Sequence, residues 1–270
     1  MKNTDYIIAG QGIAGSLLAW FLLQRGKRVL VVDPERENSS SAVSGGMIHP
    51  VTGRRIVKTW MADTLIPFAR KTYTDIEDKL AERFFEDYPV LEIFNDTQHR
   101  NDWAGRSADA GMEEYVKDEC PPNTVPNGVI APYGGRWVVN GGWLETPRFL
   151  QAIRRYLNGK QSYLHDQIDF HDVEQTENGI RWKDYTANAI IDCTGMGLYK
   201  TNHGEGLPFN PCKGELVHIN AEGLPKNIVI HGSIKIIPTG GNSYFCGATY
   251  DYTRRDTDLT IEGLEKLKSA

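Results

Sequence analysis

The first 33 residues carry the clearest hydrophobic pattern of the chain. The apolar segment Tyr6–Ala9 is typical of a buried strand, and the apolar run Ser16–Leu23 behind a glycine turn is typical of a helix. We expect this helix to end at Gly26, because glycine adopts a left-handed backbone at little cost. A second apolar segment, 27–33, follows. The order predicts a βαβ unit whose two strands are parallel neighbours.

The middle of the chain shows weaker patterns. Residues Ile56 to Leu80 suit a helix, which Pro67 is expected to break or kink into two pieces. The stretch 83–145 is rich in proline, glycine and asparagine and holds short strand candidates at 90–94 and 136–140. These features predict an antiparallel sheet with loops.

A strong amphipathic helix follows, with Thr146 as its N-cap, Pro147 at its first position and Gly159 just past its end. Its apolar face is formed by Phe149, Leu150, Ile153 and Leu157. Further strands are predicted at 163–170, 179–182, 187–195, 215–219, 228–232, 234–238 and 243–250.

Charge and composition narrow the class of partner. Thirty Lys and Arg against 35 Asp and Glu give a formal net charge of -5, and no basic block occurs. This balance argues against nucleic acid or an anionic membrane as the main partner and favours small molecules. The apolar run Ser16–Leu23 is too short to span a bilayer, and Asp5 before it does not suit a secretory signal. We expect a cytoplasmic protein.

The four cysteines lie far apart, without the CxxC spacing of a zinc or redox site. We read Cys120, Cys193, Cys212 and Cys246 as small hydrophobic residues in a reducing compartment, and we predict no metal site.

The turn between the first strand and the first helix has the sequence GQGIAG, which matches GxGxxG at Gly10, Gly12 and Gly15. Gly10 allows a tight turn, Gly12 lets the backbone approach a pyrophosphate, and Gly15 permits close packing of helix on strand. The helix that begins at Ile13 and Ala14 offers free N–H groups to negative charge. The motif therefore predicts a dinucleotide site.

Asp33, at the tip of the second strand, is placed to accept hydrogen bonds from a ribose diol, and its charge disfavours the 2′-phosphate of NADP. The motif alone does not decide between NAD and FAD. After Asp33 comes a serine run and then the small-residue loop 44–55, which can lie flat against a pyrophosphate and an isoalloxazine edge and so favours FAD. The strand 187–195, ending in Thr194 and Gly195, would return backbone to the cofactor; a core strand with a glycine exit is the alternative.

These segments resemble the D-amino-acid oxidase superfamily, the flavoproteins that include glycine oxidase, sarcosine oxidase and D-amino-acid dehydrogenases. Residues 7–33 resemble the FAD fingerprint and residues 39–55 the flavin-contacting segment of that family. Weaker matches lie at 141–157, 189–195, 213–219 and 244–253.

The resemblance implies a fold and a set of cofactor contacts. The fold would be α/β, with a Rossmann-like FAD-binding domain (1–82 and 148–205) holding a parallel sheet, and an interleaved substrate domain (83–147 and 206–270) holding an antiparallel sheet. The implied contacts are Gly10, Gly12 and Gly15 to the pyrophosphate, Asp33 to the adenosine ribose, Ser41 to a phosphate oxygen, Gly45, Gly46 and Met47 to the flavin ring, and the backbone of Ile168, in a strand, to adenine.

The resemblance also implies a departure at the end of the chain. Members of the family continue to an arginine that clamps a substrate carboxylate and to a glycine-rich turn that faces the flavin, whereas this sequence stops at Ala270. We therefore expect a chain that is truncated at its C-terminus, either as a fragment of a longer protein or as a family member that has lost part of its site.

The implied chemistry is oxidation of an amine or amino acid, in which a hydride leaves the carbon beside nitrogen for flavin N5. No acid–base residue is indispensable if the amine binds uncharged, and no catalytic residue is assigned. His49 and Tyr250 are candidates for substrate contact, although His49 also suits a surface loop and Tyr250 and Trp143 also suit a core. Arg54 and Arg55 suit an acidic substrate or, at a helix start, solvent.

Three hypotheses about function follow. The first is an FAD-dependent oxidoreductase acting on CH–NH or CH–NH2 groups of a small amine or amino acid. The second is an NAD-dependent oxidoreductase. The third is a flavin-binding fragment without catalytic activity.

Overall fold

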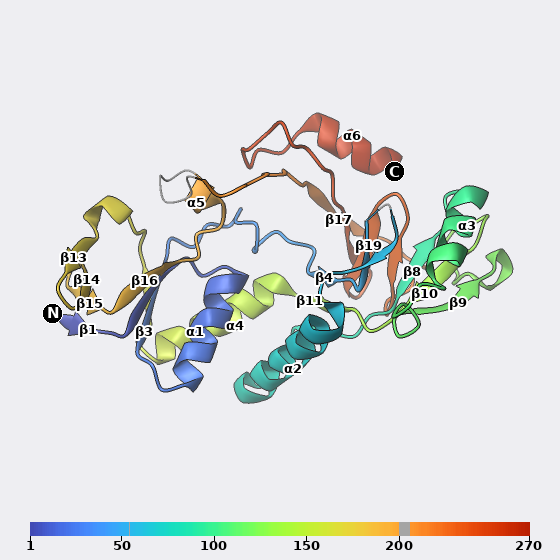
Figure 1. Ribbon diagram of the computed structural model, residues 1–270. Coiled ribbons are helices and arrows are strands. Elements are labelled where there is room, and N and C mark those ends of the chain that lie inside the picture. The colour runs from blue at the N-terminus through green and yellow to red at the C-terminus, as the bar shows by residue number, and fades with distance from the viewer. Residues whose placement is uncertain (54, 200–205) are drawn as a thin grey trace. The chain divides into compact units, whose positions relative to one another are not determined.

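A computed structural model describes residues 1–53, 55–199 and 206–270 (Figure 1). The chain folds into two compact units, Met1–Ser44 with Thr146–Pro211 and Gly45–Glu145 with Cys212–Ala270. Each unit is built from two separate stretches of sequence. Segment 45–82 differs from the sequence expectation, because it folds with the second unit rather than with the glycine turn.

The first unit is centred on a parallel sheet of four strands in the order β12-β3-β2-β16. Its strands are β2 (Tyr6–Ala9), β3 (Val29–Asp33), β12 (Tyr163–His165) and β16 (Ala189–Asp192). Helices α1 (Ile13–Gln24) and α4 (Thr146–Gly159) lie side by side (Figure 1), where Trp20 and Tyr156 place their ring centroids 5.2 Å apart. The predicted βαβ unit and its parallel pairing are confirmed.

A second sheet in the first unit buries the face of β2 and β3 that carries Ile7 and Leu30. It has the strand order β1-β15-β14-β13, with β1 (Lys2–Asn3), β13 (Glu174–Thr176), β14 (Gly179–Trp182) and β15 (Tyr185–Ala187). Trp182 is fully buried against that face. A 3-10 turn (Phe170–Asp172) and the short helix α5 (Met196–Tyr199) complete the described part of this unit.

The second unit contains a seven-stranded sheet in the order β17-β20-β19-β18-β8-β10-β9. Its strands are β8 (Val90–Ile93), β9 (Val116–Cys120), β10 (Gly135–Val138), β17 (Leu216–Asn220), β18 (Val229–His231), β19 (Lys235–Gly240) and β20 (Ser243–Gly247). The pair β8 and β18 is parallel, and the other neighbours in this sheet are antiparallel. The antiparallel sheet predicted for the second domain is thereby confirmed.

Helices and small sheets complete the described part of the second unit. These elements are β4 (Met47–Ile48), β11 (Gly142–Leu144) and β7 (Phe85–Glu86) in one sheet, the pair β5 (Val51–Thr52) and β6 (Val57–Lys58), helices α2 (Ala62–Leu80), α3 (Thr97–Arg106) and α6 (Ile261–Ser269), and a 3-10 turn (Pro122–Thr124). Ile66 of α2 and Trp143 of β11 share a core cluster with Val90, Val229 and Ile237 of the large sheet. One face of that sheet is therefore buried under α2 and β11.

Two helices differ from the sequence prediction. Residues 56–61 form β6 and a turn, so α2 begins at Ala62, and it continues as one helix through Pro67. Burial of the helix face at Ile66, Tyr73 and Ile76 outweighs the local cost of proline near the helix start. Helix α4 begins at Thr146 itself and includes Gly159.

None of the helices in the described ranges combines the length and the apolar character needed to cross a membrane.

Candidate functional site

The glycine turn of the first unit is a close contact between backbones. Gly10 has a φ of +100°, and a Cβ there would lie 2.6 Å from the carbonyl oxygen of Cys193. A Cβ on Gly15 would lie 1.9 Å from the carbonyl oxygen of Gly10. Side chains are excluded at both positions, so α1 begins directly against the end of β2, as the motif predicts.

The N-terminus of α1 is open to an anion. Gly12 is the N-cap and provides no side-chain cap, and the Ile13 N–H donates to Ser41 Oγ at 3.2 Å. Within the part of the chain that the structure describes, the N–H groups of Ala14 and Gly15 have no acceptor. A Cβ on Gly12 would lie 3.0 Å from Ser41 Oγ, so the cradle exists because residue 12 has no side chain. This arrangement fits a pyrophosphate.

Asp33 is fixed at the carboxyl end of β3. Its Oδ2 accepts from the Gln11 N–H and its Oδ1 from the Glu35 N–H, each at 2.7 Å. Each carboxylate oxygen keeps a lone pair that a ribose hydroxyl can use. Gln11 is itself buried, and its side chain donates to the Leu150 carbonyl and accepts from Arg154 Nε. Helix α4 therefore positions Gln11, and the N–H of Gln11 in turn positions the Asp33 carboxylate.

The return strand β16 lies beside this turn. Asp192 is paired in register with Ala9, and a Cβ on Gly10 would lie 3.2 Å from the Thr194 Cα. The N–H and hydroxyl of Thr194 donate to Asp192 Oδ1, and Gly195 has a φ of +59°. The predicted late return of backbone therefore reaches the glycine turn.

Ile168 is not in a strand, contrary to the sequence prediction. It lies in the segment between β12 and the 3-10 turn that follows. Its side chain is buried in the core between the two sheets of the first unit, together with Val32 and Ile180. The apolar pattern that predicted a strand here comes from this burial of a loop residue.

The segment Gly45 to Met47 belongs to the second unit and is held by β11. Trp143 Nε1 donates to the Gly45 carbonyl at 3.0 Å, the Leu144 N–H donates to the Gly46 carbonyl at 2.9 Å, and Met47 pairs with Trp143 in register. Trp143 is buried and stacks on Tyr88. It is a core residue that also fixes the backbone of the expected flavin segment.

The other candidates for substrate contact, Tyr250 and Arg55, are exposed side chains. Tyr250 is 67% exposed and lies beyond the end of β20. Arg55 is exposed in the turn between β5 and β6, not at a helix start, and Arg54 falls outside the described residues. Among the described residues, no contact of the Tyr250 or Arg55 side chain identifies a substrate subsite.

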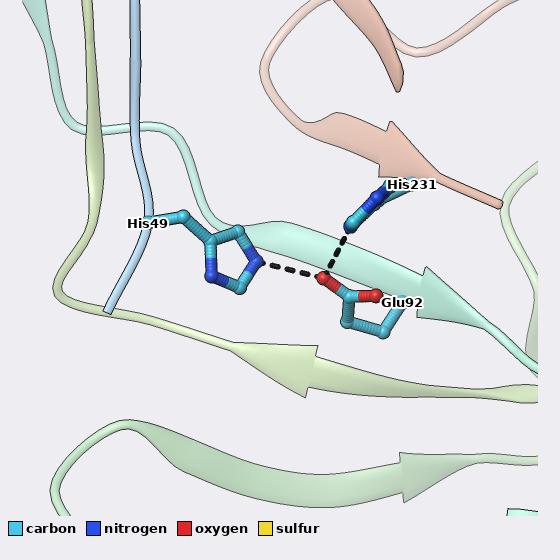
Figure 2. Close-up of side chains that lie close together, drawn as sticks. All are labelled: His49, Glu92 and His231. Atoms are coloured by element: carbon cyan, nitrogen blue, oxygen red, sulfur yellow. Dashed lines mark hydrogen bonds and ion pairs between the residues drawn. The ribbon is translucent and has the colours of Figure 1, made fainter. Parts of the chain in front are cut away.

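His49 forms a cluster with two residues that the sequence did not single out, Glu92 on β8 and His231 on β18 (Figure 2). His49 Nε2 and His231 Nδ1 each lie 2.7 Å from the same atom, Glu92 Oε1. The Glu92 side chain is 7% exposed, whereas that of His231 is 30% exposed. A charged residue inside the apolar run VLEIF was the one available sequence signal.

The hydrogen bonds define how protons are arranged in the cluster. The Val51 N–H donates to His49 Nδ1 at 3.0 Å, so the proton of a neutral His49 is on Nε2 and is donated to Glu92. The three ligand-type atoms lie within 4.8 Å of one another, a spacing that suits a metal ion. A metal at Nε2 would require the opposite tautomer, with a proton on Nδ1 facing the Val51 N–H. The residues present therefore fit a hydrogen-bonded triad better than a metal site.

Glu92 is ionised in this environment. Burial, the largest single effect, raises the pKa of this carboxyl, but hydrogen bonds from His231 and His49 and the charges of these rings outweigh it and lower the pKa to about 2.

Acid is therefore expected to weaken the fold through Glu92. A carboxyl whose pKa is lower in the folded than in the unfolded chain contributes stability above pH ~5, and loses this contribution as the pH falls towards 2. Urea unfolding of wild type and Glu92→Gln should show a stability difference that shrinks between pH 7 and pH 3. A difference that is constant with pH would contradict this assignment.

Comparison with known proteins identifies a family that binds a dinucleotide, as expected from the open N-terminus of α1. Residues 5–270 match the family described as DAO, FAD dependent oxidoreductase. Among solved structures, glycine oxidase from Bacillus cereus has a TM-score of 0.77 at 16% identity, over 98% of this chain and 76% of that one. Iminodiacetate oxidase from Chelativorans sp. has a TM-score of 0.71 at 16% identity, over 98% and 77%.

Curated relatives are longer proteins. The tRNA 5-methylaminomethyl-2-thiouridine biosynthesis bifunctional protein MnmC of Haemophilus ducreyi is 23% identical over 97% of this chain, and that of Marinobacter nauticus is 22% identical over 95%. This chain spans 41% of the first and 42% of the second. The family match extends from residue 5 to residue 270 and settles the choice between NAD and FAD in favour of FAD. The chain belongs to the DAO family of FAD-dependent oxidoreductases.

Proposed function

We propose that this protein oxidises the C–H bond next to the nitrogen of an amine or amino acid, with FAD as the acceptor of the hydride. The observation that carries the proposal is the family match across residues 5–270, together with the open pyrophosphate cradle at Gly12 and Ser41. FAD supplies the two-electron chemistry when it is bound.

The named relatives share one functional group. Glycine, iminodiacetate and a methylaminomethyl group each contain a methylene carbon bonded to an amine nitrogen. This common group supports a CH–N substrate more strongly than it supports any single molecule. The net charge of -5 and the absence of a basic block in the sequence favour a small molecule over tRNA for this chain.

In this proposal the residues of the protein bind and orient FAD. The amides at the start of α1 and Ser41 hold the pyrophosphate, Asp33 accepts from the ribose, and Thr194 and Gly195 lie beside the turn. Gly45 to Met47 offer backbone to the flavin ring, a contact that rests on the family resemblance. The rigid attachment of this segment to β11 supports that role.

Anaerobic mixing tests the proposal. Purified protein loaded with FAD is mixed with glycine, sarcosine, iminodiacetate, D-amino acids and an aminomethylated nucleoside, and the loss of the visible flavin absorption is recorded. Glycolate is the matched control, because it replaces the amine of glycine by a hydroxyl. We expect reduction by at least one amine and none by glycolate.

Two outcomes would contradict the proposal. FAD that binds but is reduced by no amine would support a flavin-binding fragment without catalysis. Reduction only by a tRNA that carries the modified base would move the substrate from small molecules to nucleic acid.

A further inference from the structure

The triad of His49, Glu92 and His231 lies on a defined face of the large sheet of the second unit. His231 and Glu92 are partners in the parallel ladder, and side chains two residues apart on a strand share a face. Val90 and Val229, two residues before them, belong to the core cluster that contains Ile237 of β19. The triad therefore lies on the same face as this cluster.

The expected flavin segment crosses that same face. A Cβ on Gly45 would lie 3.2 Å from Ile237 Cδ1 and 3.8 Å from Leu216 Cδ2. Ile237 is two residues along β19 from Lys235, the cross-strand partner of His231. His49 follows Met47 by two residues on the continuation of β4. The backbone expected to meet the flavin and the triad are thus neighbours within one unit.

His231 has one ring nitrogen available. An ionised carboxylate only accepts hydrogen bonds, so His231 Nδ1 carries a proton and donates it to Glu92 Oε1. In the neutral ring Nε2 is then unprotonated, and no partner for it is found among the described residues. Glu92 and His49 are the neighbours of this ring within the cluster, Lys235 is its partner across the antiparallel ladder, and Arg136 is the ladder partner of Glu92 on the other side.

The hydrogen bond to Glu92 makes His231 an oriented general base. A buried carboxylate that accepts from Nδ1–H fixes the tautomer and stabilises the imidazolium, which leaves Nε2 to take a proton. Histidine is the side chain that most often serves as a general base. His49 has both ring nitrogens engaged, and its Nε2 bonds to the same Glu92 oxygen as His231 (Figure 2).

We propose that His231 accepts, at Nε2, the proton that a substrate ammonium loses before oxidation, and that Glu92 and His49 are positioning residues for His231. This inference rests on the proposed amine oxidation. At neutral pH most aliphatic amines are ammonium ions, which have no lone pair with which to expel a hydride from the adjacent carbon.

The step balances in atoms and electrons. An ammonium N–H bond breaks, its electron pair stays on nitrogen, and the proton bonds to Nε2. In the oxidation proposed above, the nitrogen lone pair would form the C=N bond as the adjacent C–H pair leaves as hydride, and bound FAD would accept these two electrons. Because the His231 side chain is 30% exposed, its proton can return to water.

The first experiment determines the tautomers of His231 and His49 and needs no catalytic activity. In protein labelled with 15N-histidine, NMR of the imidazole nitrogens should show His231 protonated at Nδ1 and unprotonated at Nε2, and His49 protonated at Nε2. A His231 proton on Nε2 in wild type would overturn the proposal. So would stoichiometric binding of added Zn2+ with release of the protons at both rings.

The second experiment measures the rate of flavin reduction by an amine against pH. We expect His231→Gln to lower the rate about 100-fold at pH 7 and Glu92→Gln to lower it about 10-fold. The rate of His231→Gln should rise tenfold per pH unit and approach wild type where the amine itself is uncharged. His165→Gln, at an exposed site in the first unit, is the control and should match wild type.

The outcomes separate this inference from the proposed function. Wild type that no amine reduces defeats the proposed function, while the NMR experiment still decides the tautomer. The role of His231 as base is contradicted if an amine reduces the flavin of the wild type and His231→Gln is reduced at the same rate. It is also contradicted if the rate of His231→Gln is lower by the same factor at all pH values. Flavin content and thermal unfolding of each variant identify any loss that comes from misfolding.

Discussion

Gly15→Ala is expected to abolish FAD binding and to destabilise the first unit by about 3 kcal/mol or more. The added Cβ would lie 1.9 Å from the carbonyl oxygen of Gly10 and 3.3 Å from the Cys193 Cβ. The first of these atoms is backbone, so no side-chain rotation relieves the clash. Helix α1 must move away from β2, and its amides leave the position at which they meet the pyrophosphate. Flavin content after purification and thermal unfolding measure the two effects.

Two further variants make this result interpretable. Gly159→Ala adds the same methyl group in α4, where nothing lies within 4 Å of the new Cβ, and should leave flavin content unchanged. Gly12→Ala, at a φ of -70°, should fold normally but bind FAD more weakly, because its Cβ meets Ser41 Oγ at 3.0 Å. Full flavin occupancy in Gly15→Ala would show that the pyrophosphate does not use this turn.

The sequence predicted the glycine turn well because its determinants are local. The strand β2, the turn, α1 and β3 lie within 33 residues, and each glycine answers a steric need that the motif encodes. The position of Asp33 could also be predicted, because it ends β3, and the neighbouring strand β2 ends at the glycine turn. Ser41 was placed by family resemblance, and its contact with the Ile13 N–H supports that placement.

The second unit was harder to predict because its contacts are remote in sequence. The flavin contact of the segment at Met47 stays a prediction from the family resemblance. Its partner Trp143 lies on β11, and no local pattern encodes that pairing. The triad needs His49, Glu92 and His231 to meet through a parallel ladder between β8 and β18. A helix start at Ala62 was missed because β5 and β6 pair only in the folded chain.

Removal of Glu77 is expected to have the second large effect. This residue of α2 is 4% exposed, and its Oε1 accepts from the N–H groups of Phe84 at 2.6 Å and Phe85 at 2.8 Å. Glu77→Ala removes the charged acceptor of two backbone amides where water has little access. We expect a loss of about 3 kcal/mol in the free energy of unfolding, measured by urea denaturation.

Asp78→Ala is the matched control for this prediction. Asp78 is the next residue and also pairs with Arg83, but its side chain is 64% exposed, so its removal should cost less than about 0.5 kcal/mol. Glu77→Gln should lie between the two, because its amide oxygen can still accept from both N–H groups. Equal effects of Glu77→Ala and Asp78→Ala would show that the carboxylate acts only through Arg83.

Glu77 on α2 is linked to the site through Phe85, whose N–H it accepts from and whose strand belongs to a ladder. Phe85 on β7 pairs with Leu144 on β11, and β11 in turn pairs with Met47 on β4. Loss of the Glu77 carboxylate should therefore loosen the ladder that carries the expected flavin segment. Hydrogen exchange should accelerate at the amides of Phe85, Leu144 and Met47 in Glu77→Ala and stay unchanged in Asp78→Ala. Acceleration confined to Phe84 and Phe85 would show that the ladder holds Met47 without help from α2.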